Sequence, residues 1–251
     1  MLFEYRTIHY YTSRIAVGPP FAFAGFSDAE WFCILGYDLG KTTGAGQILD
    51  ASVGSLLLDV LDRRKCDSNF LVAVPSCMWT REDFVNAGIP DKIEKTLEEI
   101  GYCQAFYERD MVTDDLAAQA RLYPLIQTLR SVDSITVIGN HALDRLDIFP
   151  IRRFIGVESP NLHLSPTGID DVVNKVVSYA IPGTYLISAG ISSALIIDRL
   201  WDLMPDSSFI DCGSIWDAFV GIGGQREWRS HLYQDREAMS IWKTKNLRGY
   251  Y

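Results

Sequence analysis

The sequence FAFAGFSDAE, residues 21–30, holds the junction that decides the fold. Its first half, residues 21–25, is a short apolar run and predicts a buried strand. Ser27 follows as a helix N-cap, and Glu30 stands three positions later, which is the spacing of a capping box. A strand that passes through a short turn into a helix is typical of α/β proteins, in which ligands bind where the strands end.

The alternation of strand and helix continues along the chain. Apolar runs predict further strands at residues 70–74, 134–139, 154–157, 184–188 and 208–211. Helical periodicity predicts helices at residues 52–64, 91–100, 116–132, 168–180 and 194–204, with a kink or a break at Pro124. Helical connections of this length imply right-handed crossovers. We therefore expect a Rossmann-like α/β fold with a mainly parallel sheet and helices on both faces.

The composition is that of an ordinary soluble protein. Of the 251 residues, 48% are hydrophobic and 22% are charged, so a core of ordinary size can form. No apolar run approaches the roughly 18 residues that a membrane-spanning helix needs. Glu4, Arg6 and His9 interrupt the segment where a secretory signal would be continuously apolar. We therefore expect a cytoplasmic protein without a membrane span.

The cysteines form no recognisable metal or disulfide pattern. Their number is odd and no C-x-x-C pair occurs among the five, which are Cys33, Cys66, Cys77, Cys103 and Cys212. Neither a zinc cage nor a disulfide framework fits this spacing. The sequence therefore predicts reduced and buried thiols.

The net charge of −9 repels nucleic acid at long range and argues against a dedicated nucleic-acid-binding surface. Residues 222–251 are an exception, because they carry six Lys or Arg against three Asp or Glu, interleaved with aromatic side chains. We expect a main domain at residues 1–221 followed by this basic, aromatic extension. The extension suits an anionic ligand, a carbohydrate or a partner surface, or it is a solvated terminal segment that contains a helix.

Two acidic side chains follow the first predicted strand. Asp28 and Glu30 are two positions apart at the turn, so their carboxylates can converge on one divalent cation. Hard carboxylate oxygens suit Mg²⁺ or Mn²⁺, which also bridge phosphate groups. The alternative is structural, with Glu30 capping the helix and Asp28 interacting favourably with the helix dipole.

The turn SAGISS, residues 188–193, is built from small residues. Glycine and serine let the backbone approach a ligand closely, and the free N–H groups at a helix start attract an anion such as a diphosphate. The turn lacks the second glycine of G-x-G-x-x-G and the lysine of a Walker A loop. Tight packing between strand and helix is the alternative explanation.

Two further strand ends carry polar side chains. Asp211, at the end of the last predicted strand, can bond a ribose or sugar hydroxyl, or can cap the next segment. Asn140 or His141, after the predicted strand at residues 134–139, can contact a base or act as a donor. The sequence has neither a G-x-S-x-G elbow nor H-E-x-x-H, so hydrolase and metalloprotease functions fit poorly.

The order of these segments resembles the GT-D-type glycosyltransferases, a bacterial family first described as a domain of unknown function, which transfer a sugar from a nucleotide donor. GFSDAE at residues 25–30 is similar to the family's R-F-G-D-G-E segment, which contains a D-x-E metal motif. Further similarity lies, in the family's order, in GQ (46–47), LVAVP (71–75), VESPN (157–161), YLISAGISS (185–193) and IDCGS (210–214). The resemblance spans residues 20–220.

Several positions depart from the family pattern. Gly25 stands where the family has Arg, so any role of that arginine is absent here or is supplied by another residue. Ser27 and Ala29 replace the two glycines beside the aspartate, and Ser214 stands where a histidine is usual. These departures keep open a non-catalytic scaffold that binds a nucleotide.

The resemblance implies a metal-dependent glycosyltransferase that moves a sugar from a nucleotide sugar, taken to be a UDP-sugar, to a hydroxyl of a glycan, a glycoprotein, or a modified nucleotide or DNA. Asp28 and Glu30 would hold Mn²⁺ or Mg²⁺ on the donor diphosphate. A base for the acceptor would be Asp211, Glu158 or Asp115. Contacts with the donor are implied for Gly25, Gln47, Asn161, Gly190, Ser192, Ser193 and Gly213. A DNA acceptor is disfavoured by the acidic net charge, and a homodimer is one assembly that fits.

A methyltransferase that uses S-adenosylmethionine is the rival enzyme class. Its site would need a glycine-rich turn after the first strand and an acid at the end of the second. This chain instead has Asp28 and Glu30 at the first turn, and its second predicted strand ends in Pro75-Ser76-Cys77. The methyltransferase pattern therefore fits poorly.

Overall fold

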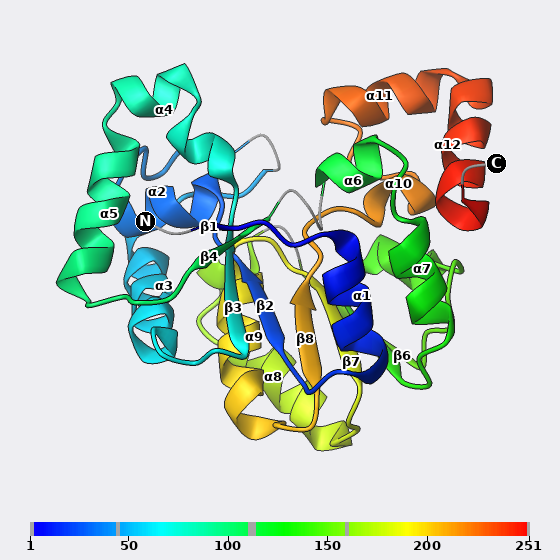
Figure 1. The fold of residues 1–251 in the computed structure, drawn as a ribbon, viewed down its shortest axis with the longest axis horizontal. Helices are drawn as coiled ribbons and strands as arrows, with labels where there is room; N and C mark the ends of the chain where they lie inside the picture. The colour runs from blue at the N-terminus through cyan, green and yellow to red at the C-terminus, as the bar shows by residue number, and fades with distance from the viewer. Residues whose placement is uncertain (1–2, 44–45, 110–113, 159–160, 250–251) are drawn as a thin grey trace.

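The protein forms one parallel sheet (Figure 1). The computed structural model describes residues 3–43, 46–109, 114–158 and 161–249. In this part of the chain the sheet has eight strands in the order β1-β4-β3-β2-β8-β7-β5-β6, and every neighbouring pair is parallel. The strands are β1 Phe3–Glu4, β2 Ala22–Gly25, β3 Phe70–Val74, β4 Phe106–Glu108, β5 Ile135–Asn140, β6 Arg153–Val157, β7 Thr184–Ser188 and β8 Ser208–Asp211. The predicted α/β fold with a parallel sheet is confirmed.

Helices cover both faces of the sheet (Figure 1). One face packs against α2 Asp28–Leu35, α3 Ala51–Arg64, α5 Ile89–Glu99, α8 Gly168–Tyr179 and α9 Ser192–Leu203. The other face packs against α1 Ile8–Val17, α7 Tyr123–Arg130 and α10 Asp217–Val220. Alternate side chains of β2 serve the two layers, since Ala22 and Ala24 belong to the first core and Phe23 to the second. Burial on both faces explains why the strands read as unbroken apolar runs.

Shorter elements complete the fold. They are α4 Glu82–Asn86, α6 Asp114–Ala118, α11 Glu227–Gln234, α12 Arg236–Arg248 and the 3₁₀ turns η1 Ser76–Trp79, η2 His141–Arg145 and η3 Leu162–Leu164. The predicted helix at residues 116–132 is divided into α6 and α7. The break falls before Pro124, which occupies the first turn of α7, where a helix tolerates proline because the first N–H groups have no partner in the helix.

The order of the strands reverses at β2. From β2 the chain adds β3 and β4 on one side, whereas β8, the last strand, pairs with the other side of β2. Phe23 of β2 pairs with Leu71 of β3 and with Ile210 of β8. After β2 the chain enters the layer of α2, and after β8 it enters the layer of α10. Connections that diverge in this way open a crevice at the carboxyl ends of the strands, where open α/β sheets bind ligands.

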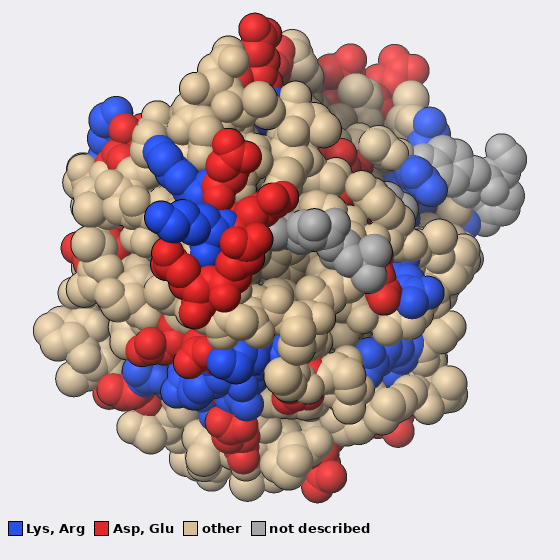
Figure 2. Space-filling model, turned by 60° about the vertical axis from the view of Figure 1, so that its left-hand side comes forward, with Lys and Arg blue, Asp and Glu red and all other residues tan. Residues whose placement is uncertain are grey.

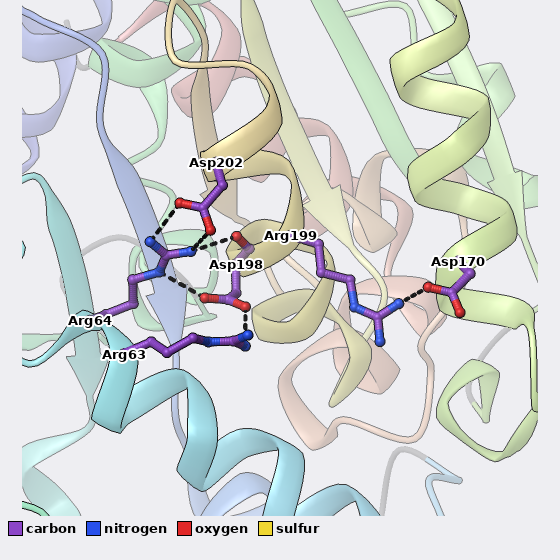
Figure 3. A network of polar contacts seen from close by, with 6 residues as sticks. All are labelled: Arg63, Arg64, Asp170, Asp198, Arg199 and Asp202. Atoms are coloured by element: carbon purple, nitrogen blue, oxygen red, sulfur yellow. Dashed lines mark hydrogen bonds and ion pairs between the residues drawn. The ribbon is translucent and has the colours of Figure 1, made fainter.

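Ion pairs fix α9, which begins at the turn after β7. Arg64 of α3 contacts Asp198 at 2.7 Å and Asp202 at 2.6 Å (Figure 3). Arg199 points away from these groups and pairs with Asp170 of α8. Arg64 and Asp198 are buried, so each offsets the cost of desolvating the other. The network ties α3, α8 and α9 into one layer.

The prediction of buried thiols is wrong for two cysteines. Cys33 and Cys212 are buried as expected and Cys77 is half-buried, but Cys66 and Cys103 are exposed. Both exposed cysteines lie where a helix leads back into the sheet, Cys66 between α3 and β3 and Cys103 between α5 and β4. Connections of this kind run over the surface of a protein. The odd count and scattered spacing of the cysteines carried no information about their exposure.

The basic, aromatic extension packs against α6 and α7. Trp242 of α12 is buried, and its indole Nε1 donates to the carbonyl of Ala117 at 2.6 Å. Asn246 is also buried, and its Oδ1 accepts from the N–H of Leu122 at 2.9 Å. Figure 1 shows α11 and α12 folded back beside α10 and α7. The described part of the extension is therefore packed into the same folded unit as the sheet.

The charged side chains are mixed on the face that carries α3, α4 and α5. Figure 2 shows Lys and Arg interleaved there with Asp and Glu, with no broad surface of one sign. A nucleic-acid backbone needs a continuous basic surface, and this face does not offer one. Within the described ranges, no helix combines the length and the apolar character that crossing a membrane requires.

Candidate functional site

A cleft lies at the carboxyl ends of the central strands. Its larger part is a cavity of about 550 Å³, and a smaller cavity of about 190 Å³ adjoins it. Both are lined by Ser27, Asp28, Arg109, Gly213, Ser214 and Arg226. These residues come from the ends of β2, β4 and β8 and from the C-terminal extension. The cleft therefore occupies the crevice that the strand order predicts.

The predicted capping box forms at the start of α2. The carboxylate Oε2 of Glu30 accepts from the N–H of Ser27 at 2.8 Å and from its hydroxyl at 2.7 Å. Glu30 is buried but still lines the cleft, and since both bonds fall on Oε2, Oε1 is the oxygen left for a ligand. Burial raises the pKa of Glu30, while the Arg109 guanidinium and the Ser27 hydroxyl oppose this rise.

Asp28 differs from Glu30 in its surroundings. It is exposed and lines both parts of the cleft, and its only hydrogen bond given by the described residues is from the N–H of Ala29 to Oδ1 at 3.0 Å. The described residues include no group of three or more His, Cys, Asp or Glu side chains that could hold a metal ion. Asp28 and Glu30 are thus a two-carboxylate set. Such a set fits Mg²⁺ or Mn²⁺ when phosphate oxygens and water complete the coordination shell.

Asp211 and Arg109 form a buried ion pair beneath the cleft. The guanidinium Nη2 of Arg109 lies 3.2 Å from Oδ2 of Asp211, whose side chain is 2% exposed. The other oxygen, Oδ1, accepts from the N–H of Gly213 at 2.9 Å. Burial raises the pKa of Asp211, and the positive charge of Arg109 is the largest opposing influence. The Asp211 carboxylate therefore holds Arg109 at the cleft wall.

The absence of a side chain at Gly25 makes room for this ion pair. A Cβ atom on Gly25 would lie 2.5 Å from Nε and 2.8 Å from Cζ of Arg109, and would also overlap Oδ2 of Asp211. Only glycine fits such a close approach. The guanidinium of Arg109 thus fills the space beside residue 25.

The turn after β7 is covered by Gln47. A Cβ atom on Gly190 would overlap the Gln47 side-chain amide, and Gly190 has a φ of +59°, which glycine adopts without strain. Both residues line the larger cavity. Asn161 lies behind them, where its Oδ1 accepts from Ile48 N at 2.8 Å and its Nδ2 donates to Gly46 O at 3.1 Å. Asn161 therefore positions the segment that carries Gln47.

The three serines of this turn have different environments. Ser188 lines the larger cavity and is nine-tenths buried, and its hydroxyl has no hydrogen-bond partner among the described residues. Ser192 is fully buried and its hydroxyl likewise has no partner in that part of the chain. The Ser193 hydroxyl accepts from Ala189 N at 3.0 Å. Buried hydroxyls are normally paired, so the buried Ser188 hydroxyl beside the cavity is an exception in the described part of the chain.

Comparison with solved structures identifies the fold. One similar structure is described as the highly conserved domain of unknown function 1792, with a distinct glycosyltransferase fold; the TM-score is 0.58 over 87% of this chain and 80% of that chain, at 14% identity. The present chain has this fold. A structure described as a new glycosyltransferase of the same domain from Streptococcus sanguinis gives a TM-score of 0.56 over 86% and 83% of the two chains, also at 14% identity. No family model and no curated protein matches the sequence.

Sequence reasoning missed Arg109, and it indicated Arg226 and Arg229 only as part of the basic extension. Arg109 follows β4, a strand of three residues that no apolar run marked. Arg229 is buried, and its Nη2 donates to the carbonyl of Ser214 at 2.7 Å and to its hydroxyl at 2.6 Å. Arg226 and Arg229 lie in the basic extension, whose charge was the one available signal for them. Ser214, where the resemblance gives histidine, is thus held by Arg229.

Three acids were expected as candidates for a base. Asp115 is exposed on α6, and exposed Glu158 lies 3.8 Å from Nε2 of His141. The described lining of the two cavities includes neither of them. Asp211 is buried behind Arg109 and is likewise not among the described lining residues. The structure therefore brings Asp28 and Glu30, but none of these three acids, to the cleft surface.

Proposed function

We propose that the protein is a glycosyltransferase that binds a nucleoside diphosphate sugar, with UDP as the nucleotide part, in the cleft at the end of β2. One observation carries the proposal. Asp28, Glu30 and Arg109 converge on one cavity at the point where the strand order reverses, in a fold similar to solved glycosyltransferases. Carboxylates and a guanidinium at such a crevice are the groups that bind a metal–diphosphate.

The diphosphate is assigned to the turn between β7 and α9. Gly190 leaves the backbone accessible, and the α9 N-terminus directs N–H groups and the positive end of the helix dipole towards the cleft. Ser188 lies in the same wall, and a small rotation of its buried hydroxyl, which has no partner among the described residues, would give a further donor. Ser192 and Ser193 are buried within this turn, and the Ser193 hydroxyl accepts from the N–H of Ala189. Gln47 lies against Gly190. Gly213 shapes the opposite wall beside Arg109.

The carboxylates suit a divalent cation on the same diphosphate. Asp28 and the free Oε1 of Glu30 would hold Mg²⁺ or Mn²⁺, which would neutralise charge on the departing nucleoside diphosphate. The capping box orients Glu30 for this purpose, because both Ser27 bonds fix the carboxylate through its other oxygen. The structural and the metal interpretations of these acids are therefore compatible.

Arg109 supplies a second positive charge to the leaving group. In the resembled family an arginine stands at the position of Gly25, and here the Arg109 guanidinium fills the space beside Gly25. Asp211 fixes its orientation through the ion pair. A preorganised cation directed at developing negative charge lowers the barrier to transfer. We therefore assign Asp211 a positioning role rather than the role of base.

The smaller cavity is the place for the acceptor. It adjoins Asp28 and is lined by Met78 and Phe84 together with Arg81 and Arg226. Apolar and cationic side chains side by side suit a hydroxyl-bearing carbohydrate or an anionic glycan. An acceptor hydroxyl bound there would attack the anomeric carbon of the donor held in the larger cavity.

The experiment is a titration of UDP and UDP-sugars, followed by calorimetry and thermal shift, with and without Mn²⁺. We expect metal-dependent stabilisation, because a ligand that binds only the folded state raises its melting temperature. Asp28→Asn should weaken metal-dependent binding at least tenfold without unfolding the protein. Asp91→Asn is the matched control, since Asp91 is an exposed acid in the first turn of another helix, α5.

Three outcomes would contradict the proposal. Equal Mn²⁺-dependent affinity in wild type and Asp28→Asn would show that Asp28 does not bind the metal ion. No response to any nucleoside diphosphate, with a response to S-adenosylmethionine, would favour the methyltransferase. Metal-dependent binding without release of UDP from any sugar donor, with or without acceptors, would leave a nucleotide-binding scaffold.

A further inference from the structure

Two thiols lie side by side at the amino ends of the strands, opposite the end of the sheet that carries the cleft. Cys66 lies between α3 and the start of β3, and Cys103 lies between α5 and the start of β4. Their Sγ atoms are 3.5 Å apart and both residues are exposed. The candidate site lies at the carboxyl ends of the same strands, so the pair is separate from it.

Hydrogen bonds join the two segments that carry these thiols. The Nε2 of Gln104 donates to the carbonyl of Arg64 at 2.5 Å, and the Sγ of Cys103 donates to the carbonyl of Lys65 at 3.1 Å. In the other direction, Lys65 Nζ donates to the carbonyl of Ile100 at 2.9 Å. The connection from α5 to β4 thus caps the last carbonyls of α3, which have no partner within the helix. These bonds from side chains to backbone carbonyls hold the two sulfur atoms close together.

We propose that Cys66 and Cys103 form a reversible disulfide on exposure to a low-molecular-weight disulfide such as oxidised glutathione. A disulfide bond is about 2.05 Å long, so the two sulfur atoms need to approach by only about 1.5 Å from their present separation. Their exposure gives the oxidant access to both. The proposal is independent of the function assigned to the cleft.

The reaction is thiol–disulfide exchange in two steps. The thiolate of one cysteine attacks a sulfur of oxidised glutathione, which forms a mixed disulfide and releases one glutathione thiolate. The thiolate of the second cysteine then attacks the protein sulfur of the mixed disulfide and releases the second glutathione. Two protein thiols are oxidised and one glutathione disulfide is reduced to two thiols. The two protons lost by the cysteines end on the two glutathione molecules.

The bond would join the segment that leads into β3 to the segment that leads into β4. Cys66 and Cys103 are 37 positions apart, and the segment between them contains β3, α4 and α5. Closing a loop of this length restricts the unfolded chain and, in a protein of this size, raises the melting temperature by roughly 5–15 °C. Because the cleft lies at the opposite edge of the sheet, the disulfide should not alter ligand affinity there.

The test treats reduced protein with oxidised glutathione, blocks the remaining thiols with N-ethylmaleimide and examines proteolytic peptides by mass spectrometry. We expect two peptides joined through Cys66 and Cys103, two hydrogens lighter than their sum, which dithiothreitol separates. The melting temperature of the oxidised protein should exceed that of the reduced protein by roughly 5–15 °C.

Cys66→Ser and Cys103→Ser are matched controls, because each keeps one of the two exposed thiols. Each should stop at the mixed disulfide with glutathione and show no gain in melting temperature. In the wild type, glutathione that remains attached to either cysteine as the end product would overturn the proposal. A link between two chains would overturn it as well. A link within one chain that leaves the melting temperature unchanged would overturn the inference that the bond fits the native fold.

Discussion

The guanidinium of Arg109 lies next to Gly25, where the buried carboxylate of Asp211 holds it. A charge-assisted hydrogen bond of this kind to a phosphate contributes about 1.5–3 kcal/mol. In Arg109→Gln we therefore expect the affinity for a nucleoside diphosphate to fall by about 10- to 100-fold. Isothermal titration calorimetry with UDP measures this change.

The same variant also leaves Asp211 buried without its cation, which destabilises the fold. The double variant Arg109→Gln/Asp211→Asn replaces the ion pair by two neutral amides. We expect it to regain most of the lost stability while the affinity for UDP stays low. Wild-type affinity for UDP in both variants would show that Arg109 stabilises the fold but does not bind the nucleotide.

Gly25 offers a second test at the scale of one residue. Gly25→Ala places a methyl group against the guanidinium of Arg109, so one of the two must move. Overpacking of a buried site costs about 1–3 kcal/mol, which urea unfolding at pH 7 measures. Gly224→Ala is the control, because a Cβ atom there would meet Tyr233 at 3.5 Å, an ordinary contact distance. Equal stabilities of the two variants would contradict the close packing beside Gly25.

At the scale of elements, the ion pairs between α3 and α9 hold the helix that begins at the turn after β7. The hydrogen bonds of Arg64 lower the pKa of Asp202 below its ordinary value. A carboxyl with a lowered pKa adds stability above its unfolded pKa of about 4, and this stability is lost as the pH falls through the folded pKa. The side chain of Asp202 is 63% exposed, so we expect a contribution of at most about 1 kcal/mol.

Asp202→Asn should accordingly lower the free energy of unfolding by up to about 1 kcal/mol at pH 7, with the deficit shrinking below about pH 4. Urea unfolding of wild type and variant between pH 7 and pH 3 provides the measurement. Asp59→Asn, which changes an exposed acid on α3, is the control and should show no such trend. A deficit that is the same at every pH would place the effect in helix propensity and not in the ion pair.

The elements also show how far sequence reasoning reaches. Strands β3, β5, β7 and β8 are buried on both faces, so their apolar runs were visible, and Ser27 with Glu30 marked the start of α2. β1 and β4 have two and three residues, too few for a periodic signal. Arg109 follows β4, so missing this strand also hid the cation of the candidate site. Pairing between Asp211 and Arg109 spans 102 positions and leaves no local pattern in the sequence.

At the scale of the whole molecule, the basic extension has two parts with different roles. Gln225, Arg226 and Arg229 line the larger cavity, so the start of the extension belongs to the cleft. The later part, α12, packs on α6 and α7 through Trp242 and Asn246. Removing residues 225–251 would therefore expose buried core surface and would also remove part of the cleft wall. A loss of activity after truncation would not separate the two roles, so single substitutions are needed.

Trp242 and Ile241 separate packing from ligand contacts, because they are adjacent on α12 but differ in burial. Trp242 is 4% exposed and touches Phe219 with ring centroids 4.7 Å apart, whereas Ile241 is 48% exposed. Trp242→Ala should cost about 3–5 kcal/mol of unfolding free energy, because it opens a cavity and removes the donor to Ala117. Ile241→Ala should cost well under about 1 kcal/mol, as surface substitutions usually do. Chemical unfolding of both variants measures the difference. A similar small cost for both would mean that α12 is a loosely attached extension, and the packing of the tail would then contribute nothing to holding Arg226 and Arg229 at the cleft.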